Sequence, residues 1–369
     1  MRKAFVAVFI AALAATLASC GKKTYELALI TDVGTINDKS FNQGAWEGME
    51  AYAKDHEISY KYYQPTSKKT DDYIESAEGA IKNGAKIVVT PGYLFENAVW
   101  VLQDRYPEVK FIILDGSPHN VTDWDTMSTI DDGEANFDVN DNVFPIFYAE
   151  QEAGFYAGYA AVKDGLRKLG FMGGMSVPAV VRFGLGYIEG AKYAATELEL
   201  ADGAVSMKYM YLNSFAPDAA HQTKASAWYG TGTDVIFAAA GGAGNSVMKA
   251  AEGATAGSVK KWVIGVDVDQ KAESTTVLTS AMKELANSVY QTLEGIYDDN
   301  AVGGEAANLD SKVDGVGLPE DFSRFTNFTK AQYDAVFAKV VAEEIEIVSD
   351  IATNVVELGG SVVTVTLEE

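Results

Sequence analysis

Short apolar runs alternate with longer amphipathic stretches along this chain. In the first third, strands are predicted from β-branched and aromatic runs at 27–31, 60–63, 86–90 and 111–114. Helices are predicted where apolar residues recur three or four positions apart, at 41–54, 71–82 and 94–106. Ser40 and Thr70 precede two of these helices as candidate N-caps. The alternation predicts strand–helix–strand crossovers and a parallel sheet.

The same order returns after an acidic, loop-like stretch at 131–134. The second unit begins with a helix predicted at 146–163. Its strands are predicted at 169–172, 205–211, 235–239 and 262–266, with helices at 187–197, 219–227 and 246–254. A strand at 276–278, a helix at 281–298, a Gly-rich connector, a helix at 330–343 and a strand at 362–366 follow. Two similar α/β units are therefore predicted.

Polar residues and glycines follow directly after the predicted strands. Ligands of open α/β sheets bind beyond the carboxyl ends of the strands, so these positions are candidates for a binding site. They are Asp32, Pro91-Gly92, Asp115, Gly241-Gly242 and Asp267. We expect them to converge on a cleft.

The N-terminus has the pattern of a secretory signal. Arg2 and Lys3 precede an apolar run at 4–17, which is too short to cross a membrane. The run ends in Leu-Ala-Ser-Cys at 17–20, which resembles the lipobox of bacterial lipoproteins. The pattern predicts a signal peptide at 1–19, a lipidated Cys20 and a tether at 20–24. An ordinary cleaved signal with a chance cysteine is the alternative.

Composition narrows the chemistry. Removal of Arg2 and Lys3 takes the formal charge from −23 to −25, which repels polyanions and makes nucleic acid an unsuitable partner. Cys20 is the only cysteine, so a lipidated chain has no disulfide. His56, His119 and His221 lie far apart, which argues against a zinc site or a Cys/His nucleophile. No metal and no cofactor are predicted.

Three segments carry a resemblance to a known family. They are Asn-Asp-Lys-Ser-Phe-Asn-Gln at 37–43, Gly-Val-Asp-Val-Asp-Gln at 265–270 and Val-Leu-Thr-Ser-Ala-Met-Lys at 277–283. Together with the lipobox they resemble the basic membrane protein family of ABC-transporter substrate-binding lipoproteins, which includes PnrA-like purine nucleoside receptors. The part of the chain after about Ala301 matches this family poorly.

The resemblance implies the type I periplasmic-binding-protein fold, with two Rossmann-like lobes joined by three crossovers around a ligand cleft. We assign 25–132 and about 269–302 to the first lobe, and 133–268 and about 303–369 to the second. The implied function is capture of purine nucleosides by lobe closure and delivery to an ABC permease. The protein would not be an enzyme, and it would face the periplasm or the exterior on a lipid anchor in the bacterial cell membrane.

The resemblance also implies roles for single residues. Phe41 and Phe215 match the rings that grip the base, since stacking on an aromatic contributes about 1–3 kcal/mol. Asp115 and Asp267 match the ribose ligands, with Lys283 as a further donor to the sugar. The remaining candidates are Asp32 and Asn42 for the base edge and Phe183, Gly241 and Gly242 for the lining. Asp38 and Asp269 are expected either to touch ligand or to brace a loop.

Other interpretations stay open from sequence. Phe41 fits the core side of a capped helix, and Phe215 fits a residue packed on the sheet. The two carboxylates at 267 and 269 admit a calcium-dependent nucleoside hydrolase, although Lys39 beside Asp38 opposes a divalent ion. The same fold could instead bind a sugar, an autoinducer-like furanose or an amino acid. A ligand-free surface lipoprotein is a further alternative.

Overall fold

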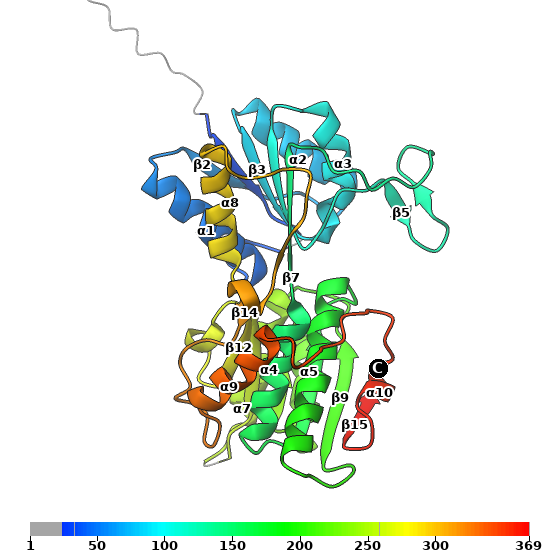
Figure 1. The fold of residues 1–369 in the computed structure, drawn as a ribbon, viewed down its shortest axis with the longest axis vertical. Helices are drawn as coiled ribbons and strands as arrows, with labels where there is room; N and C mark the ends of the chain where they lie inside the picture. Colours follow the sequence, from blue (N-terminus) through cyan, green and yellow to red (C-terminus); the bar gives the residue numbers. More distant parts are fainter. Residues whose placement is uncertain (1–23, 33, 258, 369) are drawn as a thin grey trace, which may run out of the picture.

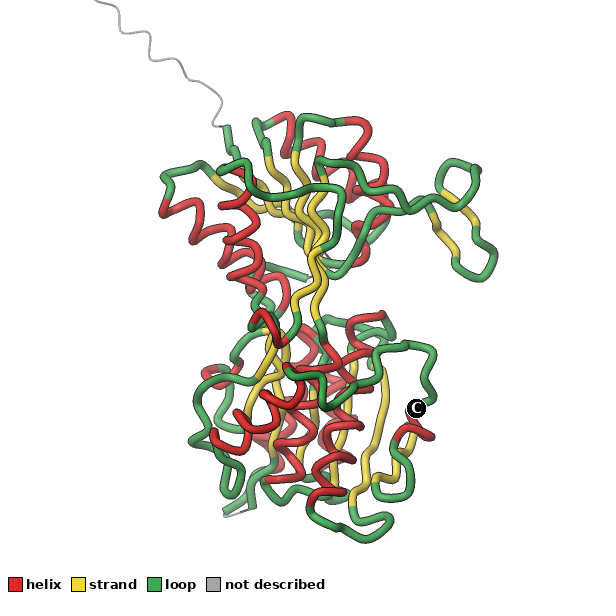
Figure 2. Tube along the Cα trace, viewed as in Figure 1, coloured by secondary structure: helices red, strands yellow, loops and turns green. Residues whose placement is uncertain are grey.

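The computed structural model describes residues 24–32, 34–257 and 259–368. The predicted signal peptide and Cys20 lie outside these residues. Two lobes are stacked along the long axis of the molecule, and each has a central sheet with helices on its faces (Figures 1 and 2). Among the described helices, none is both long and apolar enough to cross a membrane.

The first lobe is built on a six-stranded parallel sheet. Its order is β13 (Ala307–Leu309), β7 (Val143–Tyr148), β4 (Lys110–Leu114), β3 (Ile87–Pro91), β1 (Leu27–Ile30) and β2 (Tyr60–Tyr63). Its helices are α1 (Phe41–Asp55), α2 (Thr70–Lys82), α3 (Glu96–Arg105) and α8 (Leu285–Tyr297). The four strands predicted in the first third are confirmed, and β1 and β3 are buried on both faces as a parallel sheet requires.

The second lobe has a seven-stranded sheet, parallel except for one edge strand. Its order is β14 (Val316–Gly317), β12 (Val277–Lys283), β11 (Trp262–Asp267), β10 (Val235–Phe237), β8 (Lys168–Gly173), β9 (Val205–Tyr211) and β15 (Val363–Leu367). Its helices are α4 (Glu150–Lys163), α5 (Pro178–Glu197), α6 (Ala219–Gly230), α7 (Gly244–Ala254), α9 (Lys330–Val341) and α10 (Val355–Leu358). The predicted return of the C-terminus to a sheet is confirmed by β15, which pairs with β9.

The chain passes between the lobes three times, after β7, after β12 and after β13. Strand pairing at these crossovers differs from the predicted division. β7 and β13 pair in the first sheet although 133–268 and 303–369 were assigned to the second lobe, and β12 pairs with β11 in the second sheet. Each of these strands pairs in the sheet of the lobe from which the chain then departs. The hydrophobic pattern of a strand does not reveal which of the two sheets it joins.

Three predicted element boundaries were wrong. Val143–Tyr148 is a strand, so the helix predicted from 146 begins only at Glu150. Ala281 to Lys283 continue β12, and the following helix begins at Leu285. α5 begins at Pro178 rather than at 187. Proline suits the first helical position because it lacks an N–H that would have no intrahelical acceptor there. Short apolar runs fit strand and helix equally well, which explains the first two errors.

A hairpin projects from the first lobe between β4 and β7 (Figure 1). Its strands are β5 (Val121–Asp123) and β6 (Ser128–Thr129), which pair antiparallel. Asn97 fixes the base of the hairpin, since its Nδ2 donates to the carbonyl oxygens of His119 (2.8 Å) and Val121 (2.9 Å). The acidic stretch at 131–134 that was expected to be a loop follows this hairpin.

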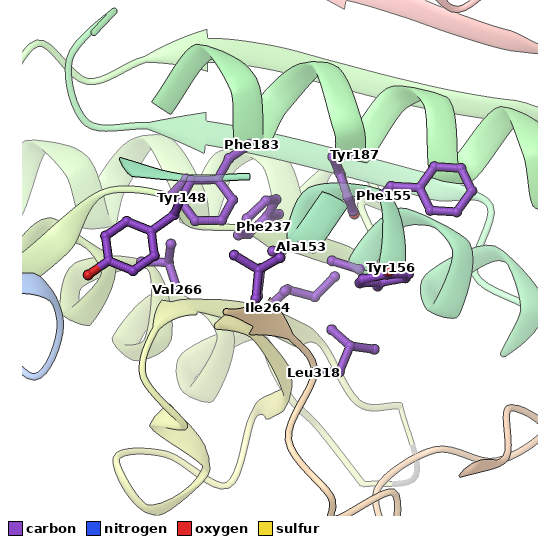
Figure 3. Packing of buried hydrophobic residues seen from close by; sticks show 14 of the residues in the cluster. Tyr148, Ala153, Phe155, Tyr156, Phe183, Tyr187, Phe237, Ile264, Val266 and Leu318 are labelled. Carbon is purple, nitrogen blue, oxygen red and sulfur yellow. The ribbon is translucent and has the colours of Figure 1, made fainter. Parts of the chain in front are cut away.

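Helices α4 and α5 pack backbone to backbone in the second lobe. A Cβ added at Gly190 of α5 would lie 1.9 Å from the carbonyl oxygen of Phe155, and one at Gly158 of α4 would lie 2.1 Å from that of Tyr187. Gly154 and Gly186 are equally close to the partner helix. Large side chains from both helices then fill the core above the sheet, among them Phe155, Tyr156, Phe183 and Tyr187 (Figure 3).

Candidate functional site

A cavity lies between the lobes at the carboxyl ends of the strands. The volume of this cavity is about 90 Å³. All the residues predicted to bind ligand line it: Asp32, Phe41, Asn42, Asp115, Phe183, Phe215, Gly241, Gly242, Asp267 and Lys283. Asp38 also lines the cavity, whereas Asp269 does not. The strand-end rule therefore led to this cavity, because the parallel strands of both sheets direct their carboxyl ends toward it.

Two phenylalanines from different lobes line the same cavity. Phe41 is the first residue of α1, and Phe215 lies in the loop after β9. The ring of Phe215 lies on the backbone of Gly174, where an added Cβ would be 2.3 Å from the ring. Gly241 has φ +53°, and a Cβ there would lie 3.5 Å from Phe215. Gly241 thus lies beside the ring of Phe215 as well as lining the cavity.

Phe183 is more a core residue than an exposed platform. It is 2% exposed and meets Phe237 edge to face, with ring centroids 5.7 Å apart (Figure 3). Its remaining edge lines the cavity beside Lys283, whose Nζ lies 5.4 Å from the ring centroid. Phe183 therefore limits the cavity from the side of the second lobe.

Lys283 is the buried cation of the site. Its side chain is 1% exposed, and its Nζ lies 2.5 Å from Asp115 Oδ2 and 2.9 Å from Glu150 Oε1. The rings of Phe41 and Tyr148 lie 5.2 and 5.1 Å from the same nitrogen. Because Lys283 ends β12 and Asp115 follows β4, this ion pair links the two lobes beside a crossover.

A second cation lies behind Glu150. Arg182 Nε donates to Glu150 Oε2 at 2.6 Å, and the side chain of Glu150 is fully buried at the start of α4. Burial alone would raise the pKa of Glu150, but Lys283 and Arg182 outweigh it and lower that pKa. Burial would likewise lower the pKa of Lys283, and the facing carboxylates raise it instead. Glu150 is therefore held as an anion between two cations.

Asp115 and Asp267 share an unusual backbone conformation. Both have positive φ, +55° and +68°, in the left-handed region that costs most residues energy. Burial raises the pKa of Asp115 to about 7 and that of Asp267 to about 6, against the attraction of Lys283. Asp115 Oδ1 is buried and accepts no hydrogen bond from the described residues. An acceptor is thus left unused beside the cavity.

A hydrogen-bond network fixes the loop that precedes α1, on the first-lobe side of the cavity. Asp38 accepts from the backbone N–H groups of Ser40 (2.9 Å), Asn42 (3.0 Å) and Gln43 (3.1 Å), so it caps α1. Ser40 was predicted as the cap, but its hydroxyl donates to Asp267 instead. Asp38 thus has the bracing role that sequence left open. The second predicted cap is displaced by one residue, since α2 begins at Thr70 itself.

Further contacts join the lobes beside the cavity. Gln270 Nε2 donates to the carbonyl oxygen of Lys39 at 2.6 Å, and Lys39 Nζ lies 3.6 Å from Glu273. Asp269 caps the short helix η3 (Gln270–Ala272) by accepting from the N–H of Lys271 at 3.0 Å. Of its two predicted roles, Asp269 therefore has the loop-bracing one.

Sequence reasoning missed several residues of the site. Glu150 lies in the stretch predicted only as the helix at 146–163, and Arg182 lies before the helix predicted at 187–197, beside the candidate Phe183. Nothing in a single carboxylate or guanidinium reveals that it is buried. Tyr93, Val177 and Val180 line the cavity from η1 (Tyr93–Phe95) and the start of α5. The strand-end rule could have found Tyr93, since it follows the Pro91-Gly92 position already identified. Within the described ranges, no cluster of three or more His, Cys, Asp or Glu side chains is arranged to hold a metal ion.

Comparison with known proteins agrees with this architecture. The Bmp family, described as ABC transporter substrate-binding protein PnrA-like, matches residues 25–351. The ABC transporter nucleoside-binding protein BmpA of Lactococcus lactis subsp. cremoris is 31% identical over 367 residues, covering 91% of this chain and 95% of that protein. The CD4+ T-cell-stimulating antigen of Listeria monocytogenes is 27% identical over 343 residues, covering 88% of each chain.

Solved structures support the fold. A solute-binding protein of an ABC transporter system from Aeropyrum pernix K1 superposes with a TM-score of 0.69 at 21% identity, covering 92% of this chain and 85% of that one. The family match covers most of the chain, and it includes the segments that supply Phe41, Asp267 and Lys283. The chain therefore belongs to the Bmp family of PnrA-like substrate-binding proteins of ABC transporters.

Proposed function

We propose that this protein captures purine nucleosides, namely adenosine, guanosine and inosine, between its lobes and delivers them to an ABC permease. The observation that carries the proposal is that the lining of a single cavity has both an aromatic part and a charged part. Phe41 and Phe215 come from opposite lobes, and Asp115, Asp267 and Lys283 supply charge at the strand ends. A nucleoside has a flat base and a hydroxylated sugar, which match these two parts.

The aromatic part suits the base. A purine between two rings buries both of its faces, and stacking on an aromatic contributes about 1–3 kcal/mol per base. Because one ring belongs to each lobe, the base makes both contacts only when the lobes approach each other. Binding energy therefore stabilises the closed arrangement.

The charged part suits the ribose. Vicinal hydroxyls donate to carboxylates in charge-assisted hydrogen bonds, and Asp115 retains an unused acceptor for them. Lys283 limits the repulsion between Asp115, Glu150 and Asp267 and can donate to a sugar oxygen. A free base lacks these hydroxyls and forfeits this part of the binding energy.

The name of one relative supports the same class of ligand. The Lactococcus lactis protein, at 31% identity, carries the name nucleoside-binding protein. For the mature chain we propose a diacylglycerol anchor on Cys20, which would hold the lobes at the outer face of the cell membrane, beside the permease. That anchor rests on the Leu-Ala-Ser-Cys sequence at 17–20 alone.

Titration calorimetry tests the ligand class. Protein beginning at Gly21, unfolded and refolded to remove carried ligand, is titrated with purine nucleosides, pyrimidine nucleosides, free bases, ribose and other sugars. We expect purine nucleosides to bind with Kd of about 1 μM or tighter, which is about −8 kcal/mol. Binding of sugars alone, or no heat with any nucleoside, would contradict the proposal.

The affinity is also expected to depend on pH. Hydroxyl donors favour ionised carboxylates, so binding lowers the raised pKa values of Asp115 (about 7) and Asp267 (about 6) and releases protons. At low pH these two carboxyl groups are protonated in the free protein and must lose their protons before they can accept from the hydroxyls, which costs binding energy. We therefore expect the affinity to weaken roughly tenfold or more from pH 8 to pH 5.5. Calorimetry in two buffers of different ionisation enthalpy measures the released protons, and a flat affinity with no release would contradict this linkage.

A further inference from the structure

The hairpin between β4 and β7 exposes a group of large apolar side chains. We call residues 119–137 the hairpin arm; it contains β5 and β6 and projects from the first lobe (Figures 1 and 2). Thirteen large apolar side chains are exposed in the described part of the chain, and four of them lie in this arm: Trp124, Met127, Ile130 and Phe137. Exposed apolar side chains that gather in one place mark an interaction surface.

Trp124 is the most prominent of these side chains. It is 60% exposed, whereas the other four tryptophans of the chain are buried or half-buried. Its ring stacks on Phe137, with centroids 6.0 Å apart and planes at 20°, and meets the ring of His119 edge to face at 5.0 Å. These two contacts orient the indole and leave the rest of it in solvent. Tryptophan is enriched among the residues that dominate protein–protein binding energies.

Hydrogen bonds hold the hairpin arm in one conformation. Asn120 Nδ2 donates to Asp131 Oδ1 at 3.1 Å and to the carbonyl oxygen of Glu134 at 2.8 Å. Asn120 Oδ1 accepts from the N–H of Asn136 at 2.7 Å, and Asn97 fixes the base of the arm as described above. A surface that is ordered before it binds loses less conformational entropy on binding.

The hairpin arm is strongly acidic. It carries five carboxylates and no lysine or arginine, and the chain has no lysine or arginine anywhere from 111 to 162. A lipid surface with anionic headgroups repels such a segment, and so does a second copy of a chain whose net charge is −23. The complementary partner is a protein surface with lysine or arginine side chains around an apolar pocket.

The base of the hairpin arm continues into the ligand cavity. Asp115 lines the cavity and lies just before the arm in the chain. Glu96, at the start of α3, joins the two, since its Oε1 accepts from the N–H of Ser117 at 3.1 Å and its Oε2 lies 3.0 Å from His119 Nε2. His119 is also the residue against which Trp124 packs. A partner bound to the arm is therefore connected to the ligand site through a short, braced loop.

We propose that the hairpin arm is a docking surface for the ABC permease, whose outer face would offer basic side chains around an apolar pocket that accepts Trp124. This proposal rests on the proposed function, because a receptor that delivers its ligand must contact the permease. The carboxylates of the arm steer the encounter, and Trp124 supplies the anchor. Since the apolar side chains of the arm lie outside the cavity lining, their loss affects delivery and not capture.

Two measurements on Trp124→Ser separate delivery from capture. Calorimetry measures the binding of purine nucleosides, and uptake of a labelled purine nucleoside is measured in cells in which the variant replaces the natural protein. We expect the affinity to stay within twofold and the uptake to fall at least tenfold. Tyr62→Ser removes an aromatic side chain that is 41% exposed on β2 of the same lobe, and this matched control should change neither quantity. Unchanged uptake with Trp124→Ser overturns the proposal.

A charge reversal tests the basic character of the partner. Asp125→Lys with Glu134→Lys reverses two exposed charges of the hairpin arm, and we expect uptake to fall at least fivefold with nucleoside affinity unchanged. Asp71→Lys with Glu75→Lys reverses two exposed charges on α2 and is the matched control. Equal effects of the two pairs, or no effect of the first, contradict a basic docking partner.

Photo-crosslinking in whole cells identifies the partner without any nucleoside. Benzoylphenylalanine is placed at position 124 or, as the control, at position 62. We expect position 124 alone to give a covalent adduct with the multi-span membrane subunit of an ABC importer. An adduct only with a second copy of this chain or with lipid, no adduct, or equal adducts from both positions overturns the docking proposal. Absence of nucleoside binding by the natural protein overturns the proposed function instead, whatever the adduct shows.

Discussion

Replacing Lys283 by methionine is expected to abolish nucleoside binding and to lower the free energy of unfolding by about 3–5 kcal/mol. The ammonium is 1% exposed and lies between Asp115 and Glu150. Methionine fills a similar volume but leaves buried carboxylates without their cation, and an uncompensated buried charge is much more costly than a lost surface ion pair. Urea denaturation measures the stability, and calorimetry measures the binding.

Two further variants identify the cause. Lys86→Met removes a cation that is 71% exposed and pairs with Glu26 at the surface, so we expect stability and binding to stay close to those of the natural protein. Adding Asp115→Asn to Lys283→Met removes the carboxylate that has lost its cation, while Glu150 keeps its pairing with Arg182, and should restore most of the stability, although not the binding. If the double variant is as unstable as Lys283→Met alone, lost packing rather than charge explains the effect.

The second large effect, on the free energy of unfolding, is expected from a substitution at Gly190. Gly190→Ala places a methyl group 1.9 Å from the carbonyl oxygen of Phe155, a backbone atom that cannot turn aside like a flexible side chain. Helices α4 and α5 must then separate, which exposes or loosens the core between them. Overpacking of this kind costs about 1–3 kcal/mol, and we expect the upper end of that range because backbone rather than side chain must move. Thermal unfolding and urea titration check it.

Gly79→Ala is the matched control for this substitution. Gly79 lies inside α2, and an added Cβ there meets no atom within 4 Å. Alanine has the higher helix propensity, so we expect this variant to be more stable by about 0.5–1 kcal/mol. The same chemical change should therefore have opposite signs at the two positions. A Gly190→Ala variant as stable as the natural protein would show that the helix contact tolerates a wider spacing.

The general plan of the fold could be predicted because parallel sheets impose strong patterns. Buried strands appear as apolar runs, and their carboxyl ends identify Asp32, Asp115 and Asp267 without any knowledge of the ligand. The assignment of β7 and β12 to a lobe could not be predicted, because a strand's own residues do not specify its partner strand. Strand pairing is a long-range property, whereas hydrophobic period is a local one.

The residues that line the cavity could be predicted, but their hydrogen-bond partners could not. The family motif at 37–43 supplied Phe41, Asp38 and Asn42, yet only the structure shows that Asp38 caps α1 and that Asn42 braces Asp32. Glu150 gave no signal at all, since a lone carboxylate near a helix start usually faces water. Its burial follows from Lys283 and Arg182, which lie more than 30 residues away in the chain.

The contact between α4 and α5 also bears on lobe closure, since it would make the two helices move as one unit. α4 begins one residue after the chain leaves β7, and its glycines meet the backbone of α5 with no layer of side chains that could slide. The two helices therefore form one unit attached to the crossover after β7. α5 has 20 residues and is about 30 Å long, so a rotation of the second lobe by roughly 10° about the three crossovers would carry the far end of α5 through roughly 5 Å. A small rotation at the crossovers would thus become a large displacement at the distant end of the lobe.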